Sequence, residues 1–226
     1  MKIKWILFCI VSALIIVLWQ FTHKTMIVWN SSSLPSQIVI DIGHGGNDPG
    51  KVGVNQALEK DINLAIGLYL KEYLSAAGYS LILTRESDMS LADSDASNQK
   101  LSDLKNRAAL IERAAPSAVI SIHQNSYPQE TVNGAQVFHS GSTESELLAS
   151  YIQEQCRRIL DPDNKRLVKQ NPDYYLFRHT ACPIVIVECG FLSNYKEANL
   201  LITEDYQRKT AWAIYMGTVQ FLQTLE

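Results

Sequence analysis

Two kinds of hydrophobic pattern alternate along this chain. Short apolar runs rich in Ile and Val are bounded by turn residues, which is typical of strands buried on both faces. Longer stretches repeat apolar residues at helical spacing and therefore predict amphipathic helices. The pattern predicts strands at 37–42, 79–84, 118–122, 135–139 and 184–188, and helices at about 59–77, 101–115, 144–160 and 205–225.

The order of these segments predicts the fold class. Because strands and helices alternate, we expect a single α/β domain with a mostly parallel, twisted central sheet and helices on both faces. The most apolar runs, at 38–42, 118–122 and 184–187, predict central strands, and the run at 135–139 is expected near an edge. The polar segment at 86–99 predicts an exposed loop.

The N-terminal segment has a different pattern. Lys2 and Lys4 precede an apolar run over 5–19. This run is shorter than the 17–25 or so residues that a spanning helix needs, but Phe21 and the bordering Trp residues can extend it into the membrane interface. No small-x-small cleavage site follows the run, which favours an uncleaved signal anchor. A cleaved signal peptide is the alternative.

These patterns divide the chain into three parts. We expect a signal anchor over 1–24, a linker rich in Ser over 25–36 and a catalytic domain over 37–226. Basic residues before the apolar run keep the short N-terminus inside, so the domain is expected on the extracytoplasmic side, anchored to the membrane. Cleavage of the segment would instead make the domain a secreted protein.

Composition narrows the function classes. The net charge of −3 gives no basic surface for nucleic acid, so no nucleic-acid partner is expected. There are four Cys residues, of which Cys9 lies in the apolar N-terminal run, and no Cys-x-x-Cys pair is present. We therefore expect neither a disulfide framework nor a cysteine zinc site.

Candidate chemistry is concentrated in four residues, His44, Glu59, His123 and Glu188. Three of them follow strongly apolar, strand-like runs, and Glu59 opens a predicted helix. In an open α/β sheet, ligands bind beyond the carboxyl ends of the strands, where such residues can meet. Two His and one carboxylate leave an open coordination position on zinc, and a further glutamate can move protons. This constellation predicts a metal-dependent hydrolase, and residue spacing leaves open which glutamate binds the metal.

Each of these residues taken alone is more often a solvated loop residue than a ligand. The loop at 43–50 favours a ligand role for His44, because its glycines permit unusual backbone angles and close approach to a ligand. The loop lacks the Gly-Lys-Ser/Thr ending of a phosphate-binding loop. The chain also has no Gly-x-Ser-x-Gly motif of a serine hydrolase and no Cys and His at positions that indicate a catalytic pair. Metal-assisted hydrolysis is therefore the simplest chemistry.

Four motifs occur in a recognisable order. They are Ile40-Asp41-Ile42-Gly43-His44-Gly45-Gly46, Leu58-Glu59-Lys60-Asp61, Ser121-Ile122-His123-Gln124-Asn125 and Val187-Glu188-Cys189-Gly190-Phe191-Leu192-Ser193-Asn194. From residue 37 onward the chain resembles the zinc-dependent N-acetylmuramoyl-L-alanine amidases of the Amidase_3 family. The resemblance implies peptidoglycan as substrate, one Zn²⁺ held by His44, Glu59 and His123, and Glu188 as catalytic base and acid.

Within this family, the length and the single apolar N-terminal segment are most similar to the sporulation-specific cortex amidases of spore formers. This resemblance implies removal of peptides from the cortex before muramic-δ-lactam formation, with consequences for germination. By analogy it also implies an accessory protein partner. The alternatives are a zinc peptidase that cuts within peptide stems and a non-catalytic cell-wall scaffold.

Other candidates are weaker. Asn125 is expected to hold either substrate or the loop around it, and Lys51 and Arg178 could pair with carboxylates of the peptide stem. Arg107 is expected in a structural salt bridge. His139 is expected to be a solvated histidine near the sheet edge.

Overall fold

The computed structural model describes residue 5 and residues 36–225. The chain divides into two compact units, 1–34 and 35–226, and the sheet with its helices belongs to the second. The predicted anchor over 1–24 and linker over 25–36 lie outside the described residues, apart from one residue in each. Among the described residues, no helix has the length and apolarity that a membrane crossing requires.

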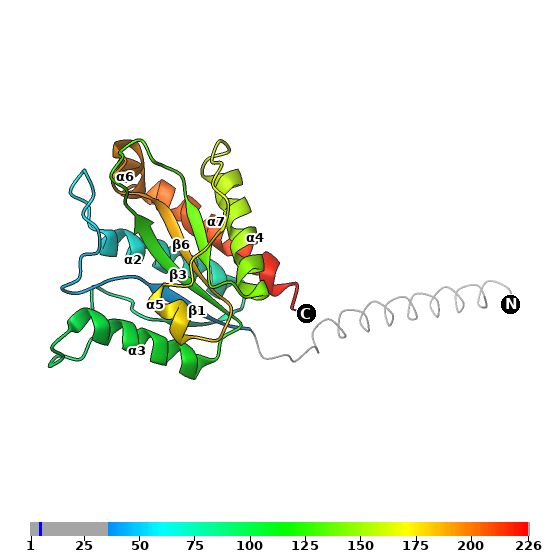
Figure 1. Cartoon of the computed structure of the whole chain (residues 1–226). Coiled ribbons are helices and arrows are strands. Elements are labelled where there is room, and N and C mark those ends of the chain that lie inside the picture. Colours follow the sequence, from blue (N-terminus) through cyan, green and yellow to red (C-terminus); the bar gives the residue numbers. More distant parts are fainter. Residues whose placement is uncertain (1–4, 6–35, 226) are drawn as a thin grey trace. The chain divides into compact units, whose positions relative to one another are not determined.

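Strands and helices alternate along the second unit (Figure 1), as predicted. The elements are, in order, β1 (Gln37–Ile42), α2 (Glu59–Ala76), β2 (Ser80–Leu83), α3 (Gln99–Ala114), β3 (Ala118–Asn125), β4 (Gln136–His139), α4 (Thr143–Ile159), β5 (Lys169–Gln170), α5 (Tyr175–His179), β6 (Ile184–Phe191), α6 (Tyr195–Leu201) and α7 (Glu204–Leu222). The five predicted strands and four predicted helices are all present. The short elements β5, α5 and α6 were not predicted.

The strands form one six-stranded sheet in the order β2-β1-β3-β6-β4-β5. Strands β2, β1, β3 and β6 run parallel, whereas β4 pairs antiparallel to β6 and carries β5 beside it. The sheet is therefore mixed but mostly parallel. The three most apolar runs occupy β1, β3 and β6 in its middle, as predicted, and β4 is separated from the edge by the two-residue β5.

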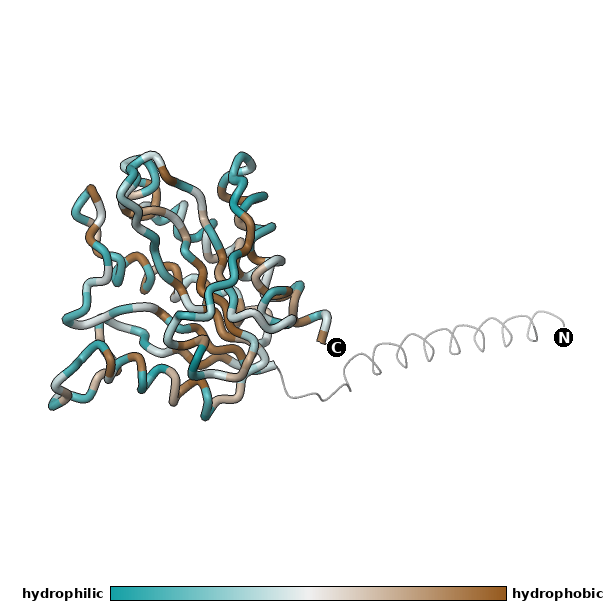
Figure 2. Tube along the Cα trace, viewed as in Figure 1, coloured by the Kyte–Doolittle hydropathy of each residue, from teal (hydrophilic) through white to brown (hydrophobic). Residues whose placement is uncertain are grey.

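Helices cover both faces of the sheet. Ile38, Ile40 and Ile42 of β1 face a core that also contains buried side chains of α2, α4 and α7. Val39, which points to the opposite face because side chains alternate along a strand, joins a smaller core with α3 and α5. The most hydrophobic segments follow the central strands (Figure 2). Burial on both faces explains why these strands carry apolar residues on both faces rather than on alternate positions only.

Strand direction and register then place the candidate residues at one edge of the sheet. Ile42 lies opposite Ile122, and His123 lies opposite Glu188 in the neighbouring strand. The loop that carries His44 leaves β1 at this edge and is tied to β3 by a hydrogen bond from the Gly43 N–H to the Ile122 carbonyl (3.1 Å). The carboxyl ends of β1, β3 and β6 therefore define one site.

Candidate active site

The loop after β1 gives His44 its position through an unusual backbone conformation. His44 has φ 61°, in the left-handed region that non-glycine residues rarely occupy. Such a conformation costs about 1–3 kcal/mol and persists where the surroundings over-determine it, which is common at functional sites. The turn is closed by reciprocal main-chain hydrogen bonds between Gly45 and Asp48 (both 3.1 Å).

Two glycines allow the close packing of this site. A Cβ on Gly43 would lie 2.3 Å from Cε1 of His123, so a side chain there would displace the imidazole. Gly50 has φ 67°, and a Cβ there would lie 2.6 Å from Oε2 of Glu59 and 2.7 Å from Cδ2 of His44. Both positions require glycine for close approach to the candidate ligands.

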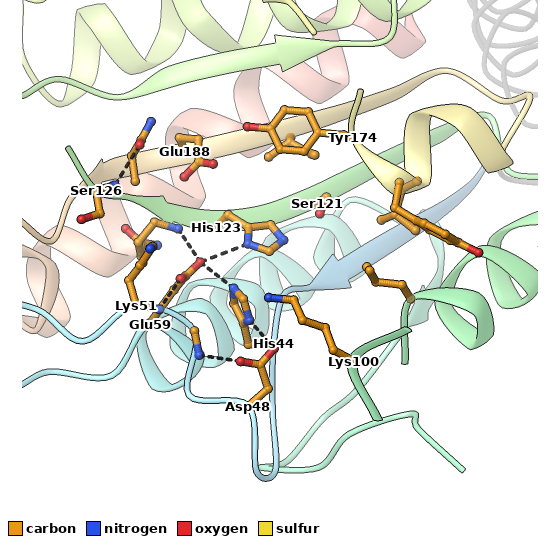
Figure 3. A pocket seen from close by; sticks show the side chains of 17 residues that line it. His44, Asp48, Lys51, Glu59, Lys100, Ser121, His123, Ser126, Tyr174 and Glu188 are labelled. Carbon is orange, nitrogen blue, oxygen red and sulfur yellow. Dashed lines mark hydrogen bonds and ion pairs between the residues drawn. The ribbon is translucent and has the colours of Figure 1, made fainter. Parts of the chain in front are cut away.

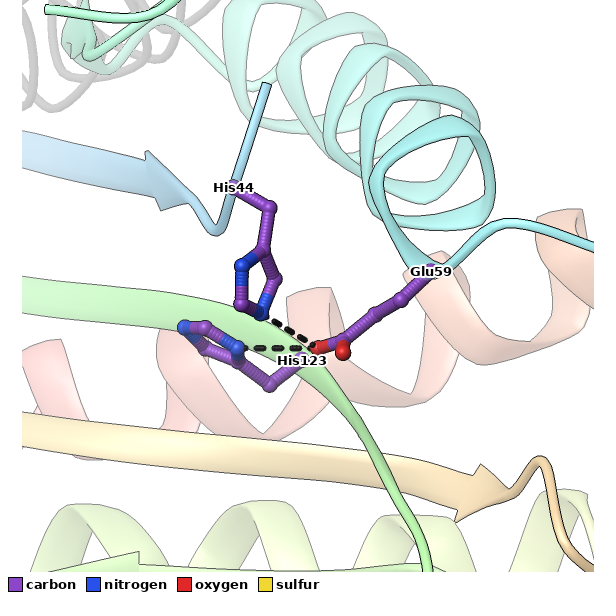
Figure 4. A group of neighbouring side chains, drawn as sticks. All are labelled: His44, Glu59 and His123. Carbon is purple, nitrogen blue, oxygen red and sulfur yellow. Dashed lines mark hydrogen bonds and ion pairs between the residues drawn. The ribbon is translucent and has the colours of Figure 1, made fainter. Parts of the chain in front are cut away.

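His44, Glu59 and His123 meet at one point, although they come from a loop, a helix and a strand (Figure 4). Oε1 of Glu59 lies 3.1 Å from Nε2 of His44 and 3.0 Å from Nδ1 of His123. The two imidazole rings meet edge to face with centroids 5.0 Å apart. One donor atom from each residue lies within 4.8 Å of the others.

Glu59 is rigidly held and almost fully buried, with 2% of its surface exposed. Its Oε2 accepts the Lys51 N–H (2.8 Å), and its Oε1 accepts the Gln124 N–H (3.0 Å). Burial alone would raise the pKa of Glu59, but hydrogen bonds and charges from His123 and His44 outweigh it and hold the pKa well below its usual range. The carboxylate is therefore ionised at neutral pH.

Asp48 orients His44 from the opposite side of the imidazole. Oδ2 of Asp48 lies 2.8 Å from Nδ1 of His44. A carboxylate in this position fixes the tautomer and ring orientation of a metal-ligating histidine. The arrangement directs Nε2 of His44 toward the point where the three donors meet.

Glu188 lies beside the three donors on β6. It is 8% exposed, and its Oε2 is buried without a hydrogen-bond partner among the described residues. Burial raises its pKa to about 7, the negative charge of Glu59 adds to the rise, and His123 and His44 partly oppose it. A carboxyl with a pKa near the working pH is suited to both accepting and donating a proton.

These residues line a cleft of about 440 Å³ (Figure 3). Asn125 and Lys51, singled out from the sequence, are part of its wall. Lys100 and Tyr174, which sequence reasoning missed, also line it. Tyr174 lies beside Glu188, and Lys100 lies on the side of His44. Neither belongs to a recognisable motif, so only the packing of α3 and α5 against the sheet identifies them.

The remaining candidates lie elsewhere. Arg178 is exposed on α5 and is not part of the cleft wall. Arg107 forms the predicted structural salt bridge, with its Nη1 2.7 Å from Oδ1 of Asp41. The expectation of a solvated His139 near the sheet edge was wrong: its exposed fraction is 5%, and β5 separates its strand from the edge.

The donor set fits zinc. Two imidazoles and one ionised carboxylate are borderline-hard N/O ligands, and three protein ligands with one open position are typical of catalytic zinc sites. Glu188 can act beside the open position, and its unpartnered oxygen is available to a water or substrate molecule. A closed structural zinc site would need a fourth protein ligand.

Comparison with known proteins agrees with this geometry. Residues 38–220 match the family model described as N-acetylmuramoyl-L-alanine amidase. The chain is 37% identical over 227 residues to the germination-specific N-acetylmuramoyl-L-alanine amidase of Bacillus subtilis strain 168, covering 97% of this chain and 95% of that protein.

Solved structures show the same similarity. The CwlD amidase of Clostridioides difficile, solved in complex with the GerS lipoprotein, superposes with a TM-score of 0.81 and 42% identity, over 84% of this chain and 99% of that chain. The catalytic domain of the amidase CwlV from Bacillus (Paenibacillus) polymyxa var. colistinus gives a TM-score of 0.71 and 28% identity, over 83% and 98% of the two chains. The four strand-end and helix-start residues thus lie in a chain that belongs to the N-acetylmuramoyl-L-alanine amidase family, Amidase_3.

Proposed function

We propose that this protein hydrolyses the amide bond between N-acetylmuramic acid and L-alanine in peptidoglycan, with one zinc ion as cofactor. The observation that carries the proposal is the convergence of His44, Glu59 and His123 beside Glu188, whose Oε2 is buried without a hydrogen-bond partner among the described residues. Membership in the amidase family supports the choice of bond.

The chain's residues divide into those that hold the metal and those that move protons. His44, Glu59 and His123 hold the ion, and Asp48 keeps the His44 imidazole in the required tautomer. Zinc bound there would lower the pKa of a coordinated water to about 7 and polarise the substrate carbonyl. The binding residues are prepared for this, because Glu59 is already ionised and hydrogen-bonded in place.

Glu188 supplies the proton transfers that amide hydrolysis requires. An amide is a weak electrophile, and an amine leaves readily only after it is protonated. Glu188 accepts a proton from the attacking water and delivers it to the nitrogen of L-alanine as the C–N bond breaks. General acid–base catalysis of this kind contributes about 10²–10⁴ to the rate. A pKa near 7 allows the same carboxyl to act in both directions.

The cleft walls suit an anionic peptide stem. Lys51 and Lys100 line the cleft, and the charge of Lys100 also acts on the nearby Asp48 carboxylate. They can pair with stem carboxylates, while Asn125 can hydrogen-bond to the peptide backbone. Arg178 lies outside the cleft, so it can contact only a part of the substrate that extends beyond the cleft.

The biological setting follows from the relatives. One relative is named for its role in germination, and another was solved with a lipoprotein bound. We infer that this chain removes peptides from spore cortex peptidoglycan before muramic-δ-lactam formation, with an accessory protein as partner. We also infer an extracytoplasmic location, with 1–24 as the membrane anchor, 25–36 as the linker and 37–226 as the catalytic domain.

The test is mass spectrometry of peptidoglycan fragments after incubation with the full-length chain and zinc. We expect peptide-free muramic acid and stems that begin with free L-alanine. The Glu188→Gln variant should give neither, whereas Glu130→Gln, which changes an exposed carboxylate, should match the wild type. Cuts within the stem would indicate a zinc peptidase. Intact peptidoglycan with zinc and partner supplied would indicate a non-catalytic scaffold.

A further inference from the structure

Arg85 is a buried cation with an unusual set of partners. It lies two residues after the end of β2 and is 2% exposed. Within the described chain its hydrogen bonds all go to main-chain carbonyl oxygens: Nε to Ile42 (3.1 Å), Nη1 to Ser87 (3.1 Å), and Nη2 to Gly43 (3.1 Å) and Lys60 (2.7 Å). A buried arginine usually pairs with a carboxylate, because burial of an uncompensated charge is costly.

The positions of these carbonyls suggest what Arg85 does. Ile42 and Gly43 lead directly into His44, and Lys60 follows Glu59 in the first turn of α2. One planar guanidinium therefore joins the loop that carries one candidate zinc ligand to the helix that carries another. The N–H donors of the guanidinium have a fixed planar geometry, so the two segments are held at a defined separation.

The burial of Arg85 is not explained by a need to supply hydrogen bonds to carbonyl oxygens that would otherwise have none. The Ile42 carbonyl also accepts from Nη1 of Arg107 (2.7 Å), and the Gly43 carbonyl also accepts from the Asn63 amide (3.2 Å). The Ser87 carbonyl also accepts a main-chain N–H. These three carbonyls would keep a donor without Arg85, so its contribution is the link between segments, to which the Asn63 amide and the Lys60 ammonium of α2 also contribute through the Gly43 and Gly46 carbonyls.

Arg107 forms a second link on the other side of the same loop. Its Nη2 donates to the His44 carbonyl (2.9 Å), and its Nη1 pairs with Asp41. Asp41 in turn accepts the Ser121 hydroxyl (2.6 Å), two residues before His123. The two arginines therefore connect the segments that carry all three candidate ligands.

The electrostatic cost of this arrangement supports a positioning role. Burial, together with the charge of Arg107, lowers the pKa of Arg85 to about 10, and the charges of three carboxylates partly oppose this change. The repulsion between two buried like charges is a cost to the stability of the fold. The left-handed backbone at His44, which both arginines brace, is the feature that needs such support.

We propose that Arg85 is a positioning residue that presets the separation of His44 and Glu59 for metal binding. The proposal rests on the zinc site proposed above. Residues beyond the ligands that orient a metal site typically change affinity by 10–100-fold when mutated. Arg85 acts through the main chain of the ligand segments rather than through the ligand side chains.

The experiment measures zinc affinity of the full-length chain by competition with a chromophoric chelator, together with the visible spectrum of the Co²⁺ form. Arg85→Met and Arg85→Lys should each weaken zinc binding by about 10–100-fold and alter the Co²⁺ spectrum. Lysine keeps the charge but lacks the planar set of N–H donors, so the Lys variant isolates the geometric contribution. If the Met variant does not fold, the zinc affinity of the Lys variant alone tests the proposal.

Leu74→Ala is the control for general destabilisation. Leu74 is buried near the end of α2, about 22 Å along the helix from Glu59 at 1.5 Å per residue. This variant should lower the free energy of unfolding and leave zinc affinity within about twofold of the wild type.

Two outcomes would overturn the proposal, and they are distinguishable. Wild-type zinc affinity and Co²⁺ spectrum in both Arg85 variants, beside a His44→Ala variant that loses zinc, would refute the positioning role alone. Equal zinc affinity in the wild type and His44→Ala would mean that the proposed zinc site is itself wrong.

Discussion

The buried carboxyl of Glu188 should destabilise the metal-free protein at the pH where it is most useful for catalysis. In the folded chain its pKa rises from 4.5 to about 7, chiefly through burial. The folded state therefore binds the proton more tightly than the unfolded state does. The stability that this provides is present below the unfolded pKa and is lost as pH rises through the folded pKa. Glu188→Gln, which keeps the shape and removes the ionisation, should prevent that loss.

The magnitude follows from the two pKa values. A tenfold change in an equilibrium constant corresponds to about 1.4 kcal/mol, so a rise from 4.5 to about 7 is worth about 3 kcal/mol at full ionisation. We expect the Gln variant to exceed the wild type by about 1 kcal/mol at pH 5 and about 3 kcal/mol at pH 8. The conversion is justified because the side chain is only 8% exposed.

The assay is urea unfolding of the full-length chain, with zinc removed by a chelator, at pH 5, 6, 7 and 8. Removal of zinc matters because a bound cation beside Glu188 would itself change the pKa. Glu130→Gln, at an exposed position, should follow the wild type within about 0.5 kcal/mol at every pH. With zinc present, the same Glu188→Gln protein should lose amidase activity by about 10²–10⁴.

The reasoning would be refuted by a difference between Glu188→Gln and wild type that does not change with pH. A Gln variant less stable than wild type at pH 8 would refute it as well. Either result would mean that Glu188 ionises without penalty in the folded protein, so that burial does not prepare it for proton transfer.

Three further predictions concern the surroundings of the site. Gly43→Ala, whose Cβ would lie 2.3 Å from the His123 ring, should weaken zinc binding at least tenfold in a chelator competition. Asp48→Asn removes the carboxylate beside Nδ1 of His44 and should weaken zinc binding by about 10–100-fold; unchanged affinity would show that Asp48 does not orient the imidazole. Asp41→Asn removes one of the two carboxylates that pair with buried Arg107, the other being Asp103, and should cost about 1.5–3 kcal/mol in urea unfolding at pH 7. Burial alone would raise the Asp41 pKa, but the arginine charge and a serine hydrogen bond outweigh it, so this difference should shrink as pH falls through the lowered pKa.

The sequence alone determined the long elements of the fold. Runs such as 118–122, which is apolar apart from Ser121, and 184–187 are buried on both faces, and apolar residues on both faces require this environment. The long helices were predicted because a stripe of apolar residues must face the sheet. The short β5, α5 and α6 escaped prediction because a few residues provide too little periodicity. For α6 a local signal existed, since Asn194 caps the helix by accepting the N–H of Glu197.

The sequence also identified the candidate site residues, because strand ends in an α/β sheet gather at one edge. Residue spacing could not establish which glutamate belongs with the histidines, although the family resemblance implied Glu59. The structure places Oε1 of Glu59 3.1 Å from His44 and 3.0 Å from His123, and it leaves Oε2 of Glu188 without a hydrogen-bond partner among the described residues. That difference depends on the start of α2 and on the register that pairs His123 with Glu188.

Tertiary structure alone decided the properties that arise between segments distant in the chain. The antiparallel direction of β4, the raised pKa of Glu188 and the link made by Arg85 all depend on packing. Periodicity reports which face of a segment is buried, because burial depends on the residue's own apolarity. It does not report which segment lies opposite, because that depends on the combined packing of the whole core.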